Sequence, residues 1–147
     1  MASGTRLALS APAKLNLHLR VLGAREDGFH DLSMLNTAID LCDTVTVELS
    51  ARETTIDCDS PEVPLSSQNL CYKAVEEFFR EWPEHRTGVS ISIRKRIPVA
   101  GGLGGGSSDA AAVIHALSLL FNERINNADF LALGARVSAD VPFFLFG

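Results

Sequence analysis

Apolar and polar residues alternate along several stretches of the first half of the chain, which is typical of strands with one buried face. The clearest stretch covers residues 14–22 and predicts a half-buried strand whose apolar face consists of Leu15, Leu17, Leu19 and Val21. Ala11-Pro12-Ala13 separates it from a short alternating segment at residues 6–10, because Pro12 offers no N–H to a sheet. Further strands are predicted at residues 32–39, 44–49, 54–58 and 88–95, with residues 40–43 connecting the first two.

In the second half, apolar residues recur at the spacing of one face of a helix. A helix is predicted from residue 69 to about residue 82, with Ser67 or Asn69 as its cap. Two more are predicted, one at residues 107–121 and one from residue 127 or 128 to about residue 137. Residues 140–142 open a last extended segment. Strands precede helices, which indicates an α+β fold and not a doubly wound parallel sheet.

A glycine-rich loop separates the last of these strands from the central helix, and five of the six residues from Gly101 to Gly106 are glycine. A backbone without Cβ atoms can approach an anion closely. The helix that follows adds unpaired N–H groups and the positive end of its dipole. The order of strand, glycine loop and helix therefore predicts a phosphate site. Ser107, Ser108 and Asp109 are candidate helix caps, and the two hydroxyls are also suited to phosphate or a metal.

This loop matches neither of the two commonest nucleotide-binding loops. A Walker-type loop ends in Gly-Lys-Ser/Thr, whereas Gly106 is followed by Ser107. The dinucleotide pattern Gly-x-Gly-x-x-Gly, started at Gly102, fails because Ser107 occupies its last position. The alternative is a flexible linker, but linkers are seldom placed between a strand and an apolar helix.

Composition is that of an ordinary globular domain, with 147 residues, 46% of them apolar and 21% charged. The net charge of −5 argues against non-specific binding of nucleic acid, which needs an excess of Lys and Arg. No apolar run is long enough to span a membrane, and the first residues do not form a signal peptide. Cys42, Cys58 and Cys71 lack a metal-ligand spacing, so we expect free thiols in a reducing cytoplasm. The apolar residues 140–147 predict that the sequence is truncated.

Four segments in this order resemble the GHMP kinases (galactose, homoserine, mevalonate and phosphomevalonate kinases): residues 12–17 (Pro-Ala-Lys-Leu-Asn-Leu), 27–30 (Asp-Gly-Phe-His), 97–111 and 139–144 (Ala-Asp-Val-Pro-Phe-Phe). The glycine loop marks the superfamily, and the first two segments narrow the resemblance to the kinases of 4-diphosphocytidyl-2-C-methyl-D-erythritol. The resemblance implies that residues 1–147 form the N-terminal ATP-binding domain, ribosomal protein S5 domain 2-like. In that fold, helices pack on one face of a mostly antiparallel sheet. A C-terminal GHMP domain, absent from this chain, would complete the cleft.

The resemblance implies ATP-dependent phosphorylation of the 2-hydroxyl of the methylerythritol part, in the non-mevalonate route to isoprenoids. Asp140 would act as base on that hydroxyl, and Lys14 would assist it and stabilise the attacking oxygen. Asn16 and Asp140 would contact the substrate, and Phe29 and His30 would hold its cytosine by stacking and hydrogen bonds. Mg²⁺ is expected on the triphosphate, bound mainly by ATP oxygens and water, so no residue is assigned as a metal ligand.

The same resemblance places ATP on the glycine loop and on two residues near the adenine, and the expected set is Asn69, Lys95, Pro98, Val99, Ala100, Gly101, Gly102, Leu103, Gly104, Gly105, Gly106, Ser107 and Ser108. Asn69 has an equal alternative as a plain helix cap. Ser138 stands where relatives often carry Gly, a difference that bears on the turn aiming Asp140. Asp43 is predicted to be a solvated turn residue.

Two other functions stay open. One is a GHMP kinase for another small alcohol, against which residues 27–30 speak. The other is a truncated nucleotide-binding polypeptide without activity. The expected partners are ATP and the cytidine diphosphate-linked substrate, with no nucleic acid and no membrane, and the expected assembly is a monomer or a homodimer.

Overall fold

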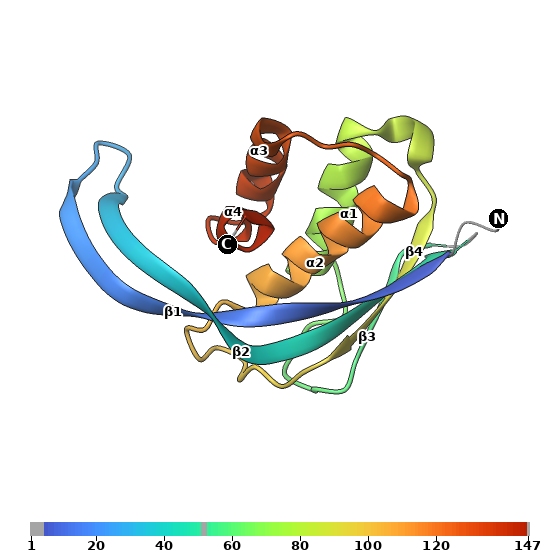
Figure 1. Ribbon diagram of the computed structural model, residues 1–147, viewed down its shortest axis with the longest axis horizontal. Helices are drawn as coiled ribbons and strands as arrows, with labels where there is room; N and C mark the ends of the chain where they lie inside the picture. Colours follow the sequence, from blue (N-terminus) through green and yellow to red (C-terminus); the bar gives the residue numbers. More distant parts are fainter. Residues whose placement is uncertain (1–4, 51–52, 147) are drawn as a thin grey trace.

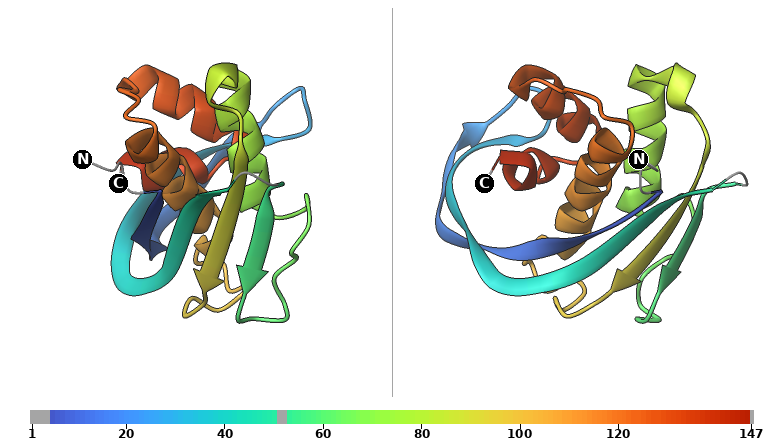
Figure 2. Two further views of the ribbon diagram at one scale, coloured as in Figure 1. Left: turned by 90° about the vertical axis from the view of Figure 1, so that its right-hand side faces the viewer. Right: turned by 45° about the vertical axis from the view of Figure 1, so that its right-hand side comes forward.

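The computed structural model describes residues 5–50 and 53–146, which form one sheet covered by helices. The strands are β1 (Arg6–Ala24), β2 (His30–Ser50), β3 (Thr55–Cys58) and β4 (Gly88–Arg94). They lie in the order β1-β2-β4-β3, and every neighbouring pair is antiparallel except β3 with β4. The helices are α1 (Leu70–Glu81), α2 (Gly105–Leu120), α3 (Asn127–Val137) and α4 (Val141–Phe146), with a 3-10 turn η1 (Pro83–His85). Figures 1 and 2 show all of them on one face of the sheet, so the α+β prediction is confirmed.

The core lies between the sheet and the helices. Alternate residues of β2 and β4, such as Val45, Val47 and Ile91, point inward and are almost completely buried. They meet α2, which is buried along most of its length and lies centrally, and the Phe78 and Phe79 rings of α1. Removing a ring of this kind from a packed core costs about 3–5 kcal/mol. None of the helices in the described part of the chain has the length and apolarity needed to cross a membrane.

Two helix predictions need correction. α2 begins at Gly105, two residues earlier than expected, and its N-cap is Gly104 without a side-chain hydrogen bond. Ser107, Ser108 and Asp109 therefore lie inside the first turns and are not caps. The segment after Asp140 is the helix α4 and not an extended stretch. Pro142 is compatible with this because the N–H groups of a first helical turn have no intrahelical partner.

Pro12 does not interrupt β1, contrary to the prediction. The strand continues through it, and residues 40–43 belong to β2 instead of forming a connection. Pro12 pairs with Cys42 and Ala13 pairs with Ile39, so Asp40 and Leu41 face no residue of β1. Irregularities of this type bend a strand pair. The missing N–H of Pro12 is thus accommodated by a bulge, not by a strand end.

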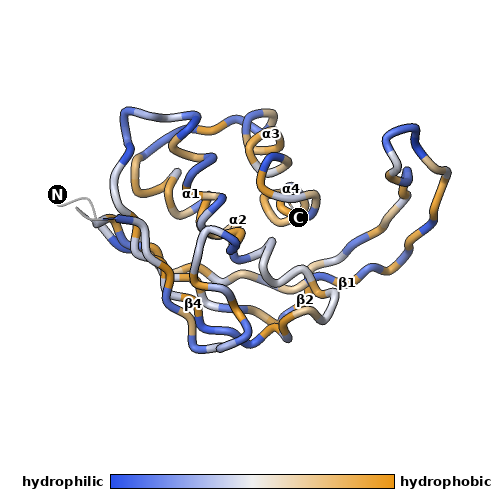
Figure 3. Tube along the Cα trace, turned by 180° about the vertical axis from the view of Figure 1, so that it is seen from behind, coloured by the Kyte–Doolittle hydropathy of each residue, from blue (hydrophilic) through white to orange (hydrophobic). Residues whose placement is uncertain are grey.

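Beyond this bulge, β1 and β2 extend as a two-stranded hairpin arm, residues 15–35, which runs past the helical layer and bends toward the side of the sheet on which the helices lie (Figure 1). The prediction of a half-buried strand at residues 14–22 is wrong for this arm, because its large apolar side chains are exposed. They are Leu15, Leu17, Leu19, Val21, Leu22, Phe29, Leu32, Met34 and Leu35. Register shifts at Leu17 and Leu22 break the regular alternation. Figure 3 shows apolar and polar residues interspersed along the arm.

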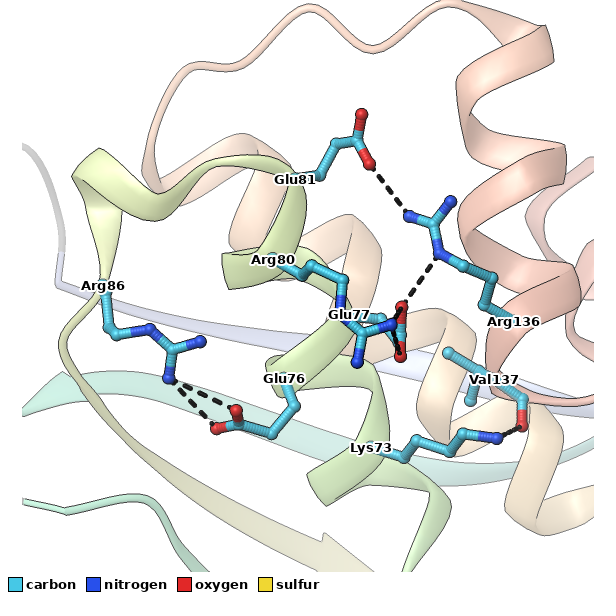
Figure 4. A network of polar contacts seen from close by, with 8 residues as sticks. All are labelled: Lys73, Glu76, Glu77, Arg80, Glu81, Arg86, Arg136 and Val137. Atoms are coloured by element: carbon cyan, nitrogen blue, oxygen red, sulfur yellow. Dashed lines mark hydrogen bonds and ion pairs between the residues drawn. The ribbon is translucent and has the colours of Figure 1, made fainter.

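Ion pairs fix α3 against α1. The nearly buried Glu77 carboxylate forms ion pairs with Arg80 of its own helix and with Arg136 of α3, with N–O distances of 2.8 and 2.9 Å. Lys73 Nζ also donates a 3.0 Å hydrogen bond to the carbonyl oxygen of Val137, the last residue of α3 (Figure 4). A hydrogen bond of this charged type contributes about 1.5–3 kcal/mol. The network therefore holds the end of α3, from which the turn carrying Asp140 departs.

Candidate functional site

The glycine loop joins β4 to α2 through residues with left-handed backbone conformations. Ala100 has φ 57°, and Gly102 and Gly104 have φ 72°. A Cβ atom on Gly104 would lie 2.9 Å from the Phe144 ring and 3.2 Å from Lys14 Cγ. Gly104 is thus required twice, by its backbone conformation and by the close approach of two side chains.

One cavity of about 320 Å³ opens over this loop and brings together nearly all the residues predicted for ATP. Its lining includes Asn69, Lys95 and every residue from Pro98 to Ser107. Ser108 does not line it, and instead borders a second cavity between β1, α2 and Phe144. Sequence reasoning missed the apolar wall of the first cavity, formed by Val63, Pro64 and Leu70, and it missed Asp109. The shape and the backbone N–H supply suit a nucleotide.

Lys14 and Asp140, which only the resemblance had placed in one site, meet at the edge of the loop. Lys14 Nζ lies 2.9 Å from Asp140 Oδ1 and 3.4 Å from Asn16 Oδ1. The Lys14 backbone N–H donates to the carbonyl oxygen of Leu103 at 2.9 Å, which ties β1 directly to the glycine loop. The Lys14 side chain is 5% exposed and that of Asp140 is 37% exposed. A half-exposed carboxylate beside a buried ammonium is suited to accept a proton from a hydroxyl.

The turn that carries Asp140 does not need glycine at position 138. Ser138 has φ −162°, which is extended backbone that any residue adopts. Its hydroxyl lies 2.9 Å from the Ser107 hydroxyl in the first turn of α2. The serine therefore adds a link between the first turn of α2 and the Asp140 turn.

Asn69 caps α1 and also borders the cavity, so both alternatives for it have a structural basis. Its Oδ1 accepts from the Cys71 backbone N–H at 2.9 Å, and its Nδ2 donates to the Pro64 carbonyl oxygen at 2.8 Å. A cap of this kind contributes about 1 kcal/mol. The cap is confirmed, while the contact with a nucleotide stays a prediction.

A buried ionic cluster lies under the loop, formed by Asp43, Lys95 and Asp109. Lys95 Nζ pairs with Asp43 Oδ2 and lies 2.9 Å from Asp109 Oδ2. The prediction that Asp43 is a solvated turn residue is wrong, because it is completely buried in β2. Burial raises the pKa of Asp109 to about 7, although Lys95 acts in the opposite direction. The alternating pattern of the strand could have predicted the burial of Asp43, since positions 43, 45 and 47 share the inward face.

Phe29 and His30 lie apart from Lys14 and Asp140, at the tip of the hairpin arm. The turn there is fixed by hydrogen bonds from the Phe29 N–H to Asp27 at 3.1 Å and from the Arg25 N–H to the Phe29 carbonyl oxygen at 2.6 Å. Phe29 is 71% exposed and lies outside the hydrophobic core. Among the residues predicted to contact the substrate, Asn16 shares a contact with Asp140, because both accept from Lys14 Nζ. Phe29 and His30 do not.

Away from the loop, one group of side chains in the described ranges has the geometry to hold a metal ion: Glu84, His85 and Glu123. These residues lie near the C-terminal end of α2, opposite the glycine loop. His85 Nε2 lies 2.7 Å from Glu123 Oε1, and the ring stacks on Phe121 with centroids 4.5 Å apart. The group is separate from the cavity over the glycine loop.

Comparison with known proteins finds a matching family and close relatives. The family model described as "GHMP kinases N terminal domain" matches residues 69–147. The chain is 45% identical over 141 residues to the 4-diphosphocytidyl-2-C-methyl-D-erythritol kinase of Acetivibrio thermocellus, covering 96% of this chain and 50% of the relative. It is 41% identical to the enzyme of the same name from Clostridium tetani, with the same coverage. The chain thus spans about half the length of the curated relatives it matches.

Solved structures give the same picture. A crystal structure of 4-(cytidine 5'-diphospho)-2C-methyl-D-erythritol kinase superposes with a TM-score of 0.76 at 40% identity, over 96% of this chain and 49% of that one. The homoserine kinase from Cytophaga hutchinsonii superposes with a TM-score of 0.71 at 18% identity, over 93% of this chain and 42% of that one. The second likeness concerns the fold alone.

Proposed function

The chain belongs to the GHMP kinases as their N-terminal domain, and from this membership we propose that it carries the nucleotide site and the catalytic pair of a 4-diphosphocytidyl-2-C-methyl-D-erythritol kinase. ATP would donate its γ-phosphoryl group to the 2-hydroxyl of the methylerythritol part. In this proposal Asp140 accepts the hydroxyl proton, and Lys14 stabilises the attacking oxygen as charge develops on it.

The observation that carries the proposal is the Lys14–Asp140 pair beside the glycine loop. Phosphoryl transfer requires a nucleophile, an anion cradle and a cation within one small volume. Here Lys14 touches Leu103 through its backbone and Asp140 through its ammonium, so one residue joins the loop to the base. The loop, the ammonium and the carboxylate are therefore adjacent in the structure.

Mg²⁺ fits this site as an ion carried by the nucleotide. Two carboxylates beside the loop, Asp140 and Asp109, already pair with Lys14 and Lys95. Mg²⁺ favours substrate phosphate oxygens and water, with few protein ligands. We therefore propose that the triphosphate and water supply most of its ligands, and that the ion neutralises charge on the transferring group.

For the acceptor, we propose that the exposed Phe29 ring stacks on the cytosine and that His30 hydrogen-bonds its edge. Two points support this: both residues match the Asp-Gly-Phe-His segment of the resemblance, and an exposed aromatic ring in a hydrogen-bonded turn is a platform for a base. A long substrate such as a cytidine diphosphate ester is suited to contacts at two separate places, the arm tip and Asp140.

The hairpin arm also supports a proposal about domain organisation. Its exposed apolar side chains form no core of their own, and two-stranded hairpins are marginal in water. The chain spans about half of its relatives, so we propose that a second GHMP domain in the complete protein packs against the arm and closes the cleft. The three free cysteines agree with a reducing compartment, and we place the reaction in the cytoplasm.

The test is a phosphoryl-transfer screen with the product of the complete gene. ATP with 4-diphosphocytidyl-2-C-methyl-D-erythritol, mevalonate and homoserine would be compared by ADP release and product mass. We expect transfer to the cytidyl substrate alone. Transfer to mevalonate or homoserine alone would instead support a GHMP kinase for another alcohol, and nucleotide binding without any transfer would support a binding module.

A further inference from the structure

Asp43 occupies a position that the proposed chemistry leaves unused. It is fully buried on the inward face of β2 and accepts three hydrogen bonds. Two come from the backbone N–H groups of Arg96 and Ile97, at 2.5 and 2.8 Å, immediately before the loop begins at Pro98. The third comes from Lys95 Nζ. One carboxylate thus fixes the entry of the glycine loop to the longest strand of the sheet.

Lys95 links Asp43 to the other end of the loop, where α2 begins. Its Nζ lies 2.9 Å from Asp109 on α2 and would lie 3.2 Å from a Cβ atom on Gly105, the first residue of that helix. The entry and the exit of the loop are therefore held by one ionic cluster. An ammonium group has three N–H donors, and Asp43 and Asp109 use two of them. Lys95 also lines the nucleotide cavity.

We propose that Asp43 is a positioning residue for the nucleotide, acting through Lys95 and the loop entry, and that Asp109 takes up a proton when polyphosphate binds. This inference rests on the proposed function only in assuming that the cavity binds a nucleotide. Asp43 never touches the ligand. It positions the Lys95 ammonium, whose remaining N–H is available to the cavity. It also positions the backbone N–H groups of Arg96 and Ile97 at the entry of the loop.

Proton uptake by Asp109 follows from the negative charge of the bound nucleotide. Two carboxylates share one ammonium under a loop that receives a polyanion, so a bound nucleotide favours the neutral form of one of them. Asp109 is the one poised to change, since burial has raised its pKa to about 7. Hydrogen bonding to Asp43 and the charge of Asp109 raise the Lys95 pKa despite its burial, so Lys95 stays charged. The neighbouring Cys71 and Cys58 thiols have pKa values raised by burial and stay neutral.

The main variant is Asp43→Asn in the complete protein, with Asp40→Asn as the matched control. The introduced amide keeps an oxygen for the two backbone N–H groups but turns a donor toward Lys95, which the ammonium cannot accept. We expect the Kd for ATP and its KM to rise about tenfold or more, with kcat within about threefold. Asp40 lies in the same strand and is exposed, and its variant should leave all three values unchanged. An unchanged Kd in a folded Asp43→Asn protein would overturn the proposal.

Proton uptake provides a second measurement. Titration calorimetry of ATP binding at pH 7 in two buffers of different ionisation enthalpy should show uptake of up to about half a proton per nucleotide. Asp109→Asn should abolish the uptake, and equal uptake in that variant would refute the assignment even if Asp43→Asn does not fold. A wild-type protein that binds ATP but transfers no phosphate would reject the kinase proposal and leave this one intact. A wild type that does not bind ATP would reject both.

Discussion

Lys14 and Asp140 lie 126 positions apart in the sequence, yet Lys14 Nζ donates a 2.9 Å hydrogen bond to Asp140 Oδ1. The pair is asymmetric, because the ammonium is buried while more than a third of the carboxylate side chain reaches solvent. The ammonium is held by β1, and the carboxylate by the turn between α3 and α4. This asymmetry leaves the carboxylate accessible to a substrate and keeps its cation in place.

Asp140→Asn should lose most of the turnover and retain ATP binding. An amide of the same shape does not accept the hydroxyl proton, and removing a general base lowers kcat by about 10²–10⁴-fold. The measurement is kcat with the cytidyl substrate, next to a Kd for ATP. Asp57→Asn, which changes an exposed carboxylate in β3, is the control. Unchanged turnover in a folded Asp140→Asn protein would refute the assignment of the base.

Phe29→Ala should raise the KM for the cytidyl substrate about tenfold and leave the KM for ATP unchanged. Stacking of a base on an aromatic ring contributes about 1–3 kcal/mol. Because Phe29 is mostly exposed, the melting temperature should change little. Leu131→Ala removes an exposed apolar side chain from α3 and serves as control. Equal loss for both substrates would indicate a structural role for the turn.

Gly102→Ala and Gly104→Ala form a matched pair that separates two costs. Both glycines have φ 72°, but a Cβ on Gly102 would meet nothing within 4 Å, whereas one on Gly104 would clash with Phe144 and Lys14. Gly102→Ala should cost about 1 kcal/mol, from backbone conformation alone. Gly104→Ala should cost about 2 kcal/mol more, from overpacking. Denaturant unfolding measures both, and equal losses would exclude the close packing around Gly104.

The raised pKa of Asp109 predicts that the stability of the fold depends on pH. Its pKa is about 7 in the folded protein against an ordinary value of 3.8, so between about pH 4 and 7 the native state holds a proton that the unfolded state has lost. The free energy of unfolding should therefore fall as pH rises through this window, by at most about 1.4 kcal/mol per pH unit, and then level off. His115, whose pKa is lowered by burial, acts in the opposite direction. The difference between wild type and Asp109→Asn isolates the Asp109 contribution, and parallel curves would contradict it.

The parts of the fold that depend on local pattern could be predicted from the sequence. The alternation in β2 and β4 and the Asn69 cap of α1 are local properties, and so is the glycine run between a strand and a helix. The meeting of Lys14 with Asp140 was different, because no local pattern implies a contact across 126 positions. It followed from resemblance, and the structure agrees with it.

Three features were not predictable because tertiary context decides them. The bulge at Pro12 depends on two unpaired residues of the partner strand. The helix α4 forms because Val141 and Leu145 pack against Gly134 of α3, where a Cβ atom would lie 2.8 Å from Leu145. The apolar face of the arm is exposed because no helix extends over it in the described structure, although its alternation is that of a half-buried strand.

Gly104 also limits how this chain can change during evolution. Any larger side chain there requires room from Phe144 and from Lys14 at the same time. If Lys14 is needed for chemistry, only Phe144 is free to shrink, and that change alone does not relieve the backbone strain at φ 72°. A substitution at this position therefore has no single-step compensating mutation, and we expect lineages that keep the activity to keep this glycine.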